Sequence, residues 1–390
     1  MILYTAAHGG FREAAPLGGG AAICDLLVDE WSRTRPFEFQ LIRPDATARE
    51  IVSFSESQYA NFSRAFEKKA TEEILRHDPK TTTVLVNDVS EGPDFRAIKD
   101  YRVFTIYHVD VVAYVADIYF NGWIRPETTV KLYRRLGWAL PPISKLVWEK
   151  QEASVRYSRG LIMPSEGMKE TMLRCYPECP SEKIHVMPWG AADPGPAGDA
   201  ASLRHEFGIA ENARVLLTLS RISPEKGQDL LLEALIEWER REDYPREPLW
   251  LFICGDAAFM QGVKFLKRLR TLAMRLQKTR VIFPGYVTGD RKGAFFALAD
   301  LYIFPSRHES YGLTLIEALA AGVPAVCLNH HGARDVIREE FGEIVQPEDL
   351  IAAIARLLKS DLHPMRAAAR EFAAKNRFSD RAAELARLIG

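Results

Sequence analysis

The chain has 390 residues and a mass of 44.0 kDa, which is too long for one hydrophobic core and suits two domains. Hydrophobic residues make up 47% of the chain, a composition that excludes dominant disorder. The 51 Lys and Arg residues are balanced by 52 Asp and Glu residues, so the chain has no excess of positive charge that would indicate a nucleic-acid partner. No run of about 18 apolar residues occurs, so we expect no membrane-spanning segment and a cytoplasmic location.

Short apolar runs alternate with amphipathic helical patterns along the chain, which is typical of parallel βαβ units. Residues 1–7 have no basic lead-in and predict a first strand rather than a signal peptide. The predicted strands are 2–6, 38–42, 83–86, 103–107, 161–163, 214–219, 249–253, 280–283, 301–304, 323–327 and 343–345. The predicted helices are 20–34, 58–77, 228–240, 259–277, 290–298, 312–321, 333–338 and 347–358. The expected fold class is α/β, with two doubly wound parallel sheets.

Residues 188–200 are rich in Gly and Pro and have the composition of a linker. We expect one Rossmann-like domain over 1–187 and a second over 201–365, facing an interdomain cleft at the carboxyl ends of the strands. Residues 366–390 are helical in composition, with a break near 376–379 and an apolar stripe after it. Such a stripe must be buried, so we expect this helix to return to the first domain.

The cysteines are five in number and lie mostly in apolar contexts, which favours buried thiols and a reducing compartment. Cys175 and Cys179, with His185 after them, are candidate metal ligands. Their C-x3-C spacing is not the usual C-x2-C, however, and no fourth ligand accompanies them. We therefore expect no bound metal and no resident cofactor.

The most informative stretch is 299–322, where a buried strand ends at Pro305 and a helix opens near Gly312. Free N–H groups at such a helix start suit a phosphate. Glu309 in the loop and Glu317 in the helix would serve hydroxyls instead, so the stretch suits a nucleotide joined to a polyol. The alternative is that both glutamates are structural or solvated charges. The backbone donors would come from Ser310, Tyr311, Gly312 and Leu313.

A second strand–loop–helix unit, 214–230, carries Arg221 and Lys226 in its loop. Two cations at the carboxyl end of a strand suit a diphosphate, which Arg can grip as a fork and Lys as a point charge. The alternative is that both are solvated surface cations.

Taken together, S-R-I-S-P-E-K-G at 220–227 and P-S-R-H-E-S-Y-G-L-T-L-I-E-A-L-A-A-G at 305–322 resemble the retaining glycosyltransferases of family 4. That family has the GT-B fold, and its Glu-x7-Glu element corresponds to Glu309 and Glu317. The resemblance is strong over 160–345 and extends to the rest by architecture. Further family-like pieces begin, in order, at Leu161, His185, Phe252 and Phe283.

The resemblance implies a role for each candidate. Arg221 and Lys226 would neutralise the donor diphosphate and the leaving charge, while Glu309 would contact the hydroxyls of the transferred sugar. Glu317 would hold the ribose of the nucleotide. The rest of the implied donor-binding set is Gly285 and Tyr286 near the base, and the backbone of Ser310, Tyr311, Gly312 and Leu313.

In the first domain, Gly18 and Gly19 match a glycine pair that lies close to donor phosphate or acceptor, and His108 matches a histidine near the reaction centre. The alternatives are a flexible turn and a histidine satisfied at a strand end. The sequence departs from the family at 329–335, where N-H-H-G-A-R-D replaces a Gly-Gly pair followed by Glu. This loop therefore assigns no donor sugar.

We expect a retaining glycosyltransferase that moves a sugar from a nucleotide-diphosphate sugar, a UDP- or GDP-sugar above all, to a hydroxyl of a carbohydrate or lipid-linked acceptor. The family resemblance implies no essential metal, because cations and a helix start can stabilise the departing nucleotide. Such an enzyme would serve glycan, glycolipid or polysaccharide biosynthesis. The alternatives are a catalytically silent nucleotide-sugar-binding relative that regulates a partner, or a GT-B phosphorylase or epimerase.

Residues 121–160 combine a net charge of +5 with interleaved Trp and Tyr. A basic and aromatic stretch can lie on an anionic bilayer, so we expect a peripheral contact with the inner face of a membrane. The alternative is a helix pair whose aromatic side chains pack in the core.

Overall fold

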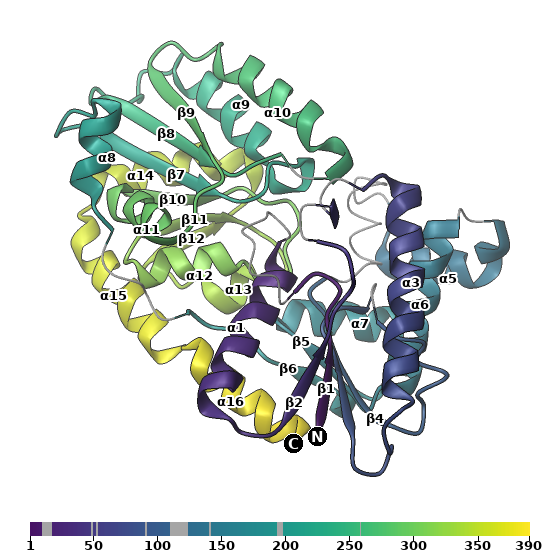
Figure 1. Cartoon of the computed structure of the whole chain (residues 1–390). Helices are drawn as coiled ribbons and strands as arrows, with labels where there is room; N and C mark the ends of the chain where they lie inside the picture. The colour runs from purple at the N-terminus through teal and green to yellow at the C-terminus, as the bar shows by residue number, and fades with distance from the viewer. Residues whose placement is uncertain are drawn as a thin grey trace. The chain divides into compact units, whose positions relative to one another are not determined.

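The computed structural model describes residues 1–9, 18–47, 50–51, 54–89, 92–109, 124–139, 142–192, 198–257 and 259–390. These residues form two compact units, Met1–Trp189 with Ser379–Gly390 and Gly190–Phe378. Figure 1 shows that each unit is a parallel sheet covered by helices.

The first unit has a six-stranded sheet in the order β2-β1-β3-β4-β5-β6, with every pairing parallel. All residues of β1, β3 and β5 are buried, as expected for a parallel sheet covered on both faces. The strands are β1 (Ile2–Thr5), β2 (Phe39–Ile42), β3 (Thr83–Val86), β4 (Arg102–Ile106), β5 (Gly160–Met163) and β6 (Ile184–Val186). The main helices are α1 (Gly19–Thr34), α3 (Glu56–Ile74), α5 (Pro126–Leu136), α6 (Pro142–Tyr157) and α7 (Glu166–Cys175), with a short 3₁₀ turn η2 (Gly137–Ala139) after α5.

The second unit repeats the design, with the strand order β12-β11-β10-β7-β8-β9, again parallel. Its strands are β7 (Arg214–Leu219), β8 (Leu249–Cys254), β9 (Thr279–Gly285), β10 (Leu301–Phe304), β11 (Ala325–Leu328) and β12 (Gly342–Val345). Its helices are α8 (Ala200–Phe207), α9 (Gln228–Trp238), α10 (Phe259–Ala273), α11 (Gly289–Leu298), α12 (Leu313–Ala320), α13 (Ala333–Val336), α14 (Leu350–Lys359) and α15 (Leu362–Lys375).

The C-terminal helix α16 (Phe378–Ile389) packs on the first unit, and α15 stays with the second. The indole Nε1 of Trp31 in α1 donates to the carbonyl of Ala382, 3.2 Å away, and Ala382 and Leu385 are fully buried. The two parallel sheets and this returning helix confirm the predicted fold class. The predicted linker, 188–200, lies in part outside the described residues, at 193–197.

The chain changes units at two points that are hydrogen-bonded to each other within the second unit. The N–H of Ala191 donates to Asn376 O at 2.8 Å, and the N–H of Phe378 donates to Ala191 O at 2.7 Å. Gly190 beside them has φ +73, and an added Cβ would lie 2.5 Å from the Asn376 oxygen. Only glycine suits both that conformation and that close approach.

Most predicted elements are found, and all five cysteines are free and buried, as predicted. The prediction missed β6, which has only three residues, Ile184–Val186, with a polar histidine at its centre. So short a run carries too little apolar pattern to be recognised alone. None of the described helices combines the length and the apolar character needed to cross a bilayer.

Candidate functional site

The candidate site of the second unit is built at the carboxyl ends of the neighbouring strands β7 and β10. After β7 the chain passes through the 3₁₀ turn η4 (Pro224–Lys226) into α9, and after β10 it passes through residues 305–312 into α12. The two connections touch at Gly227, whose φ is +65 and whose added Cβ would lie 1.9 Å from Pro305 O. The Arg307 N–H also donates to Glu225 O at 2.9 Å. The sheet and these contacts therefore hold both connections together.

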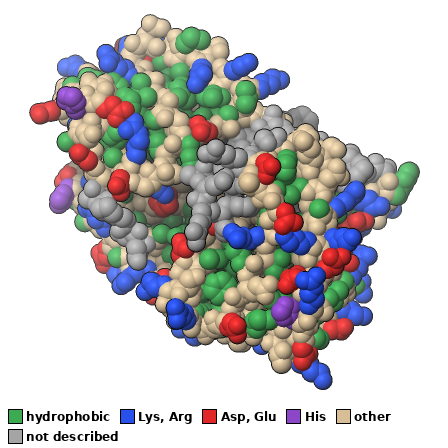
Figure 2. Space-filling view, viewed as in Figure 1, with side chains coloured by type: hydrophobic (Ala, Val, Ile, Leu, Met, Phe, Trp, Pro, Cys, Tyr) green, Lys and Arg blue, Asp and Glu red, His purple; other side chains and the backbone are tan. Residues whose placement is uncertain are grey.

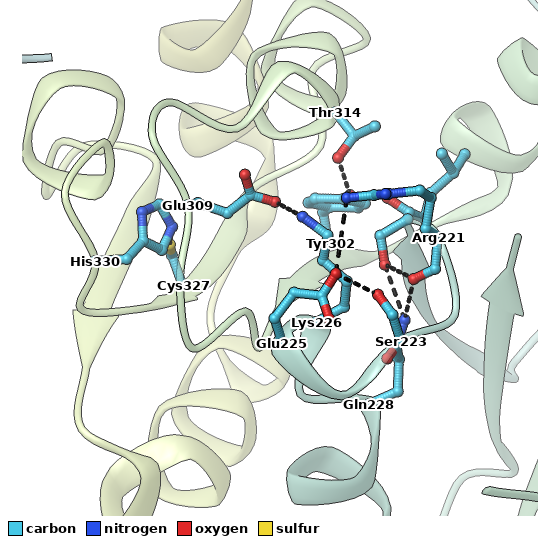
Figure 3. A network of polar contacts seen from close by, with 12 residues as sticks. Arg221, Ser223, Glu225, Lys226, Gln228, Tyr302, Glu309, Thr314, Cys327 and His330 are labelled. Atoms are coloured by element: carbon cyan, nitrogen blue, oxygen red, sulfur yellow. Dashed lines mark hydrogen bonds and ion pairs between the residues drawn. The ribbon is translucent and has the colours of Figure 1, made fainter. Parts of the chain in front are cut away.

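The central contact of the site is an ion pair between Lys226 and Glu309, which lie on the two connections and point toward each other (Figure 3). Both side chains are largely buried, with exposed fractions of 11% and 19%. Burial alone would raise the pKa of Glu309, but Lys226, with His330 and Arg221 nearby, holds that pKa below its usual value. Glu309 is therefore a carboxylate at neutral pH.

Arg221 sits beside the same turn and is held by its neighbours. Its guanidinium lies 3.7 Å from Glu225, which also accepts a hydrogen bond from Ser223 at 2.6 Å. The side-chain amide of Gln228 donates to the carbonyl of Arg221 at 2.8 Å and to Ser220 Oγ at 2.9 Å. Figure 3 shows Arg221, Ser223 and Gln228 on one side of Lys226, with Glu309 on the other.

Helix α12 begins beside Glu309, as predicted. Its N-cap is Gly312, with φ +98 and no side chain to cap the first turn. Tyr302 supports the turn from β10, since its hydroxyl donates to Leu219 O at 2.9 Å and its oxygen can accept from the hydroxyl of Thr314, whose Oγ1 lies 2.8 Å away. An uncapped helix start at the end of a parallel strand can receive an anion. The residues predicted to supply donors here, Ser310, Tyr311, Gly312 and Leu313, all lie in this turn.

Glu317 lies in the second turn of α12 and pairs with Lys292 of α11 at 2.8 Å. Both side chains are about one-third exposed, at 29% and 32%. Of the predicted pair Gly285 and Tyr286, Gly285 is the last residue of β9 and Tyr286 follows it. Gly285 has φ +83 and its carbonyl accepts from the Gly255 N–H at 2.8 Å, and Tyr286 is 43% exposed.

One neighbour of Glu309, His330, was not predicted as a site residue. His330 is buried on the loop after β11, and its Nε2 lies 3.2 Å from Cys327 Sγ. Burial lowers the pKa of His330 to about 3, so its imidazole is neutral near pH 7. The loop approaches the site closely: the Gly332 N–H donates to Glu309 O at 3.4 Å, and an added Cβ at Gly332 would lie 2.4 Å from Tyr311 Cα. Residues 329–335 depart from the family pattern, but nothing in their sequence predicts that the loop lies against Glu309.

The first unit places His108 beyond the end of β4, in a network with β1 and β3. The ring Nε2 lies 3.1 Å from Asn87 Oδ1, which also accepts a 2.6 Å hydrogen bond from the hydroxyl of Tyr4. The Asn87 amide in turn donates to Gly20 O in α1 at 3.1 Å. Gly18 and Gly19, the predicted pair, are the N-cap and the first residue of this helix, and Gly18 has φ 107. The structure thus groups His108 and the glycines within one unit.

Among the described residues, no three His, Cys, Asp or Glu side chains gather in a way that could hold a metal ion.

Comparison with known proteins shows what the second unit is similar to. The family model described as "Glycosyl transferases group 1" matches residues 199–376, nearly the whole second unit. The match covers less than half of the chain, and it shows what the second unit is similar to. The predicted resemblance is thereby confirmed for the unit that holds Arg221, Lys226, Glu309 and Glu317.

Curated relatives agree with the family match. D-inositol 3-phosphate glycosyltransferase 2 of Catenulispora acidiphila is 32% identical over 222 residues, 56% of this chain and 51% of the relative. A GDP-mannose-dependent phosphatidylinositol monomannoside mannosyltransferase of Mycolicibacterium smegmatis is 28% identical over 277 residues, 65% of this chain and 67% of the relative. The chain thus matches only about half the length of the first of these relatives.

Solved structures extend the likeness to the whole fold. The Anabaena protein HepE, in complex with UDP and glucose, has a TM-score of 0.69 at 18% identity, covering 99% of this chain and 98% of its own. Sucrose-phosphate synthase from Thermosynechococcus elongatus has a TM-score of 0.72 at 16% identity, covering 99% and 97%. At such identities the likeness shows the GT-B fold alone.

Proposed function

We propose that this protein is a retaining glycosyltransferase that moves a sugar from a UDP- or GDP-sugar to a hydroxyl of a carbohydrate or lipid-linked acceptor. The observation that carries the proposal is the buried Lys226–Glu309 pair at the adjoining ends of β7 and β10, beside the uncapped start of α12. The family match of residues 199–376 supports it.

The proposed chemistry follows from where charge develops. Breaking the sugar–phosphate bond leaves negative charge on the nucleoside diphosphate and positive charge on the sugar ring. Lys226, Arg221 and the N–H groups at the start of α12 would bind the diphosphate and stabilise it as it departs. Because Glu309 and Glu225 hold the two charged side chains and Gln228 holds the backbone carbonyl of Arg221, little reorganisation is needed during the reaction.

Glu309 has two roles in the proposed mechanism. It fixes the Lys226 ammonium, and as a carboxylate it can accept hydrogen bonds from hydroxyls of the transferred sugar. Glu317 would accept from the ribose hydroxyls, with Lys292 holding its carboxylate in place. Gly285 and Tyr286 would lie near the base. In the first unit, His108, Gly18 and Gly19 are the proposed contacts to acceptor or donor phosphate.

The first experiment is a thermal-shift panel with UDP, GDP, ADP, their common sugars, and NAD as a control. A ligand at about 100 times its dissociation constant adds about 2.7 kcal/mol of stability, which such a scan detects. We expect stabilisation by one nucleoside diphosphate and its sugar, followed by transfer to an added acceptor with retained anomeric configuration. Stabilisation without transfer or donor hydrolysis would favour a silent relative, and a response to NAD alone would contradict the proposal.

A further inference from the structure

Helix α5 and the turn η2 of the first unit expose three large hydrophobic side chains within seven residues. Leu132 and Leu136 are 45% and 46% exposed, and Trp138 is 81% exposed. The other face of α5 packs inward, with Thr129 and Val130 buried. Because residues four apart share a helix face, Leu132 and Leu136 form one outward stripe that leads to Trp138.

A second stripe of α5 runs beside the first and is positively charged. Lys131 and Arg135, again four residues apart, are exposed, and neither makes an ion pair within the described part of the chain. By contrast, Arg134 pairs with Glu152 and Glu178. The acidic residue nearest on the same helix is Glu127, one turn before Lys131. Cations without acidic partners beside exposed leucines are not explained by the stability of this unit.

The neighbouring helix α6 clarifies the predicted basic and aromatic stretch 121–160. Its Trp148 is 4% exposed and packs against Tyr133 at 4.9 Å between ring centroids. Lys150 is buried and pairs with Glu67 of α3 at 2.9 Å. These aromatic and basic side chains serve the core, as the alternative interpretation held, and Trp123 lies outside the described residues.

We propose that Leu132, Leu136 and Trp138, with Lys131 and Arg135 beside them, form a docking surface for an anionic lipid bilayer. Leucines can enter the acyl boundary, a tryptophan suits the headgroup level, and cations one residue away meet lipid phosphates. Figure 2 shows hydrophobic and basic side chains together on the side where Figure 1 places α5. A nucleic acid would use the cations and leave the leucines without a role, whereas a bilayer uses both.

This surface goes beyond the proposed function, and its test does not depend on transfer. The purified chain is sedimented with vesicles of phosphatidylcholine alone and of phosphatidylcholine with an equal amount of phosphatidylglycerol, at low and physiological salt. We expect binding to the anionic vesicles, weakened by salt, and little binding to the neutral ones.

Three variants divide the surface into its parts. Trp138→Ala and the pair Leu132→Ser with Leu136→Ser should each lower partition to anionic vesicles about tenfold. The pair Lys131→Gln with Arg135→Gln should lower it about tenfold or more and remove most of the salt dependence. The matched controls are Met274→Ala, a 73% exposed residue of the second unit, and Arg240→Gln with Arg246→Gln, also exposed. The controls should bind like the unmodified chain.

The outcomes that overturn the proposal are specific. They are absence of pelleting with anionic vesicles at low salt, or unchanged pelleting of all three variants. A concentration-dependent dimer that Trp138→Ala abolishes, without vesicle binding, would instead assign the surface to a second copy of the chain. Nucleotide-induced thermal shifts of the variants, measured in parallel, show that they remain folded and keep a failure here separate from a failure of the proposed function.

Discussion

The two units present different chemistry at the ends of their strands. In the second unit, Lys226, Glu309, Lys292 and Glu317 form ion pairs between neighbouring connections and helices. In the first unit, the corresponding network joins a phenol, an amide and an imidazole around Asn87. Under the proposed function, the fixed charges of the second unit would meet a charged donor, whereas in the first unit hydrogen bonds fix the position of His108.

Among the substitutions that test this contrast, Lys226→Ala should cause the largest loss of stability and activity. The variant leaves the Glu309 carboxylate buried without its cation, which should destabilise the protein by about 3 kcal/mol. It also removes a charge aimed at the departing nucleotide, so kcat should fall about 1,000-fold and nucleoside diphosphate should bind more weakly. Thermal unfolding and initial rates measure both. Lys359→Ala, an exposed lysine at the end of α14, is the control and should change neither. Near-normal turnover would remove Lys226 from the proposed chemistry.

Glu309→Ala tests the other half of the pair. We expect turnover to fall about 100-fold, because a contact to the transferred sugar is lost in the transition state. Binding of the nucleoside diphosphate should stay nearly intact, since the diphosphate is assigned to the cations. Isothermal titration with the diphosphate and steady-state kinetics separate the two effects. Full activity of this variant would contradict the central assignment.

The acid stability of the protein should also depend on Glu309. Its folded-state pKa is lowered by Lys226, so the stabilising contribution is present above the unfolded pKa of about 4.3 and is lost as the pH falls through the folded value. The unmodified chain should therefore be more stable than Glu309→Gln at pH 7, and the gap should narrow below about pH 4.3. Thermal unfolding at several pH values measures it. A gap that does not change with pH would mean that the carboxylate is not stabilised by its partner.

Glu317→Gln should have a smaller effect, because this pair is more exposed. The amide keeps one acceptor for a ribose hydroxyl but loses charge, so we expect affinity for the nucleotide to fall about tenfold with little change in stability. Glu343→Gln, which loosens the Arg356 pair at β12, is the matched control and should leave nucleotide affinity unchanged. Equal loss in both variants would indicate a general electrostatic effect rather than a contact.

The sequence predicts more of the second unit's site than of the first's, for a physical reason. Residues 299–322 contain a buried strand, a turn and a helix start in one continuous run, so Glu309 and Gly312 could be placed locally. The contact between Glu309 and Lys226 could not be predicted locally. Lys226 is 83 positions away in the sequence, and it meets Glu309 only because β7 and β10 pair. Local sequence patterns do not indicate which strands become neighbours in the sheet.

The same limit hides the supports of His108 and the loop around His330. Asn87 is an ordinary polar residue after a strand until β1, β3 and β4 align and bring Tyr4 and His108 to it. His330 reaches Glu309 only because β11 lies beside β10. For the stretch 121–160, composition does not predict which side chains are exposed, since one tryptophan, Trp148, is buried in the core and another, Trp138, is exposed to solvent.

The smallest effect should come from the hydrogen-bond network around Asn87, through Gly20→Ala. Gly20 is the second residue of α1 and its φ is not positive, so alanine fits the backbone, but the added Cβ would lie 2.9 Å from His108 Cδ2 and push the ring away from Asn87. We expect stability close to that of the unmodified chain and a fall in kcat of about three- to tenfold, on the scale of a misplaced contact. The decisive measurement is a double-mutant cycle with His108→Gln. If Gly20 acts through the imidazole, alanine should cost nothing further once the histidine is gone, whereas additive losses would show that the start of α1 meets substrate on its own.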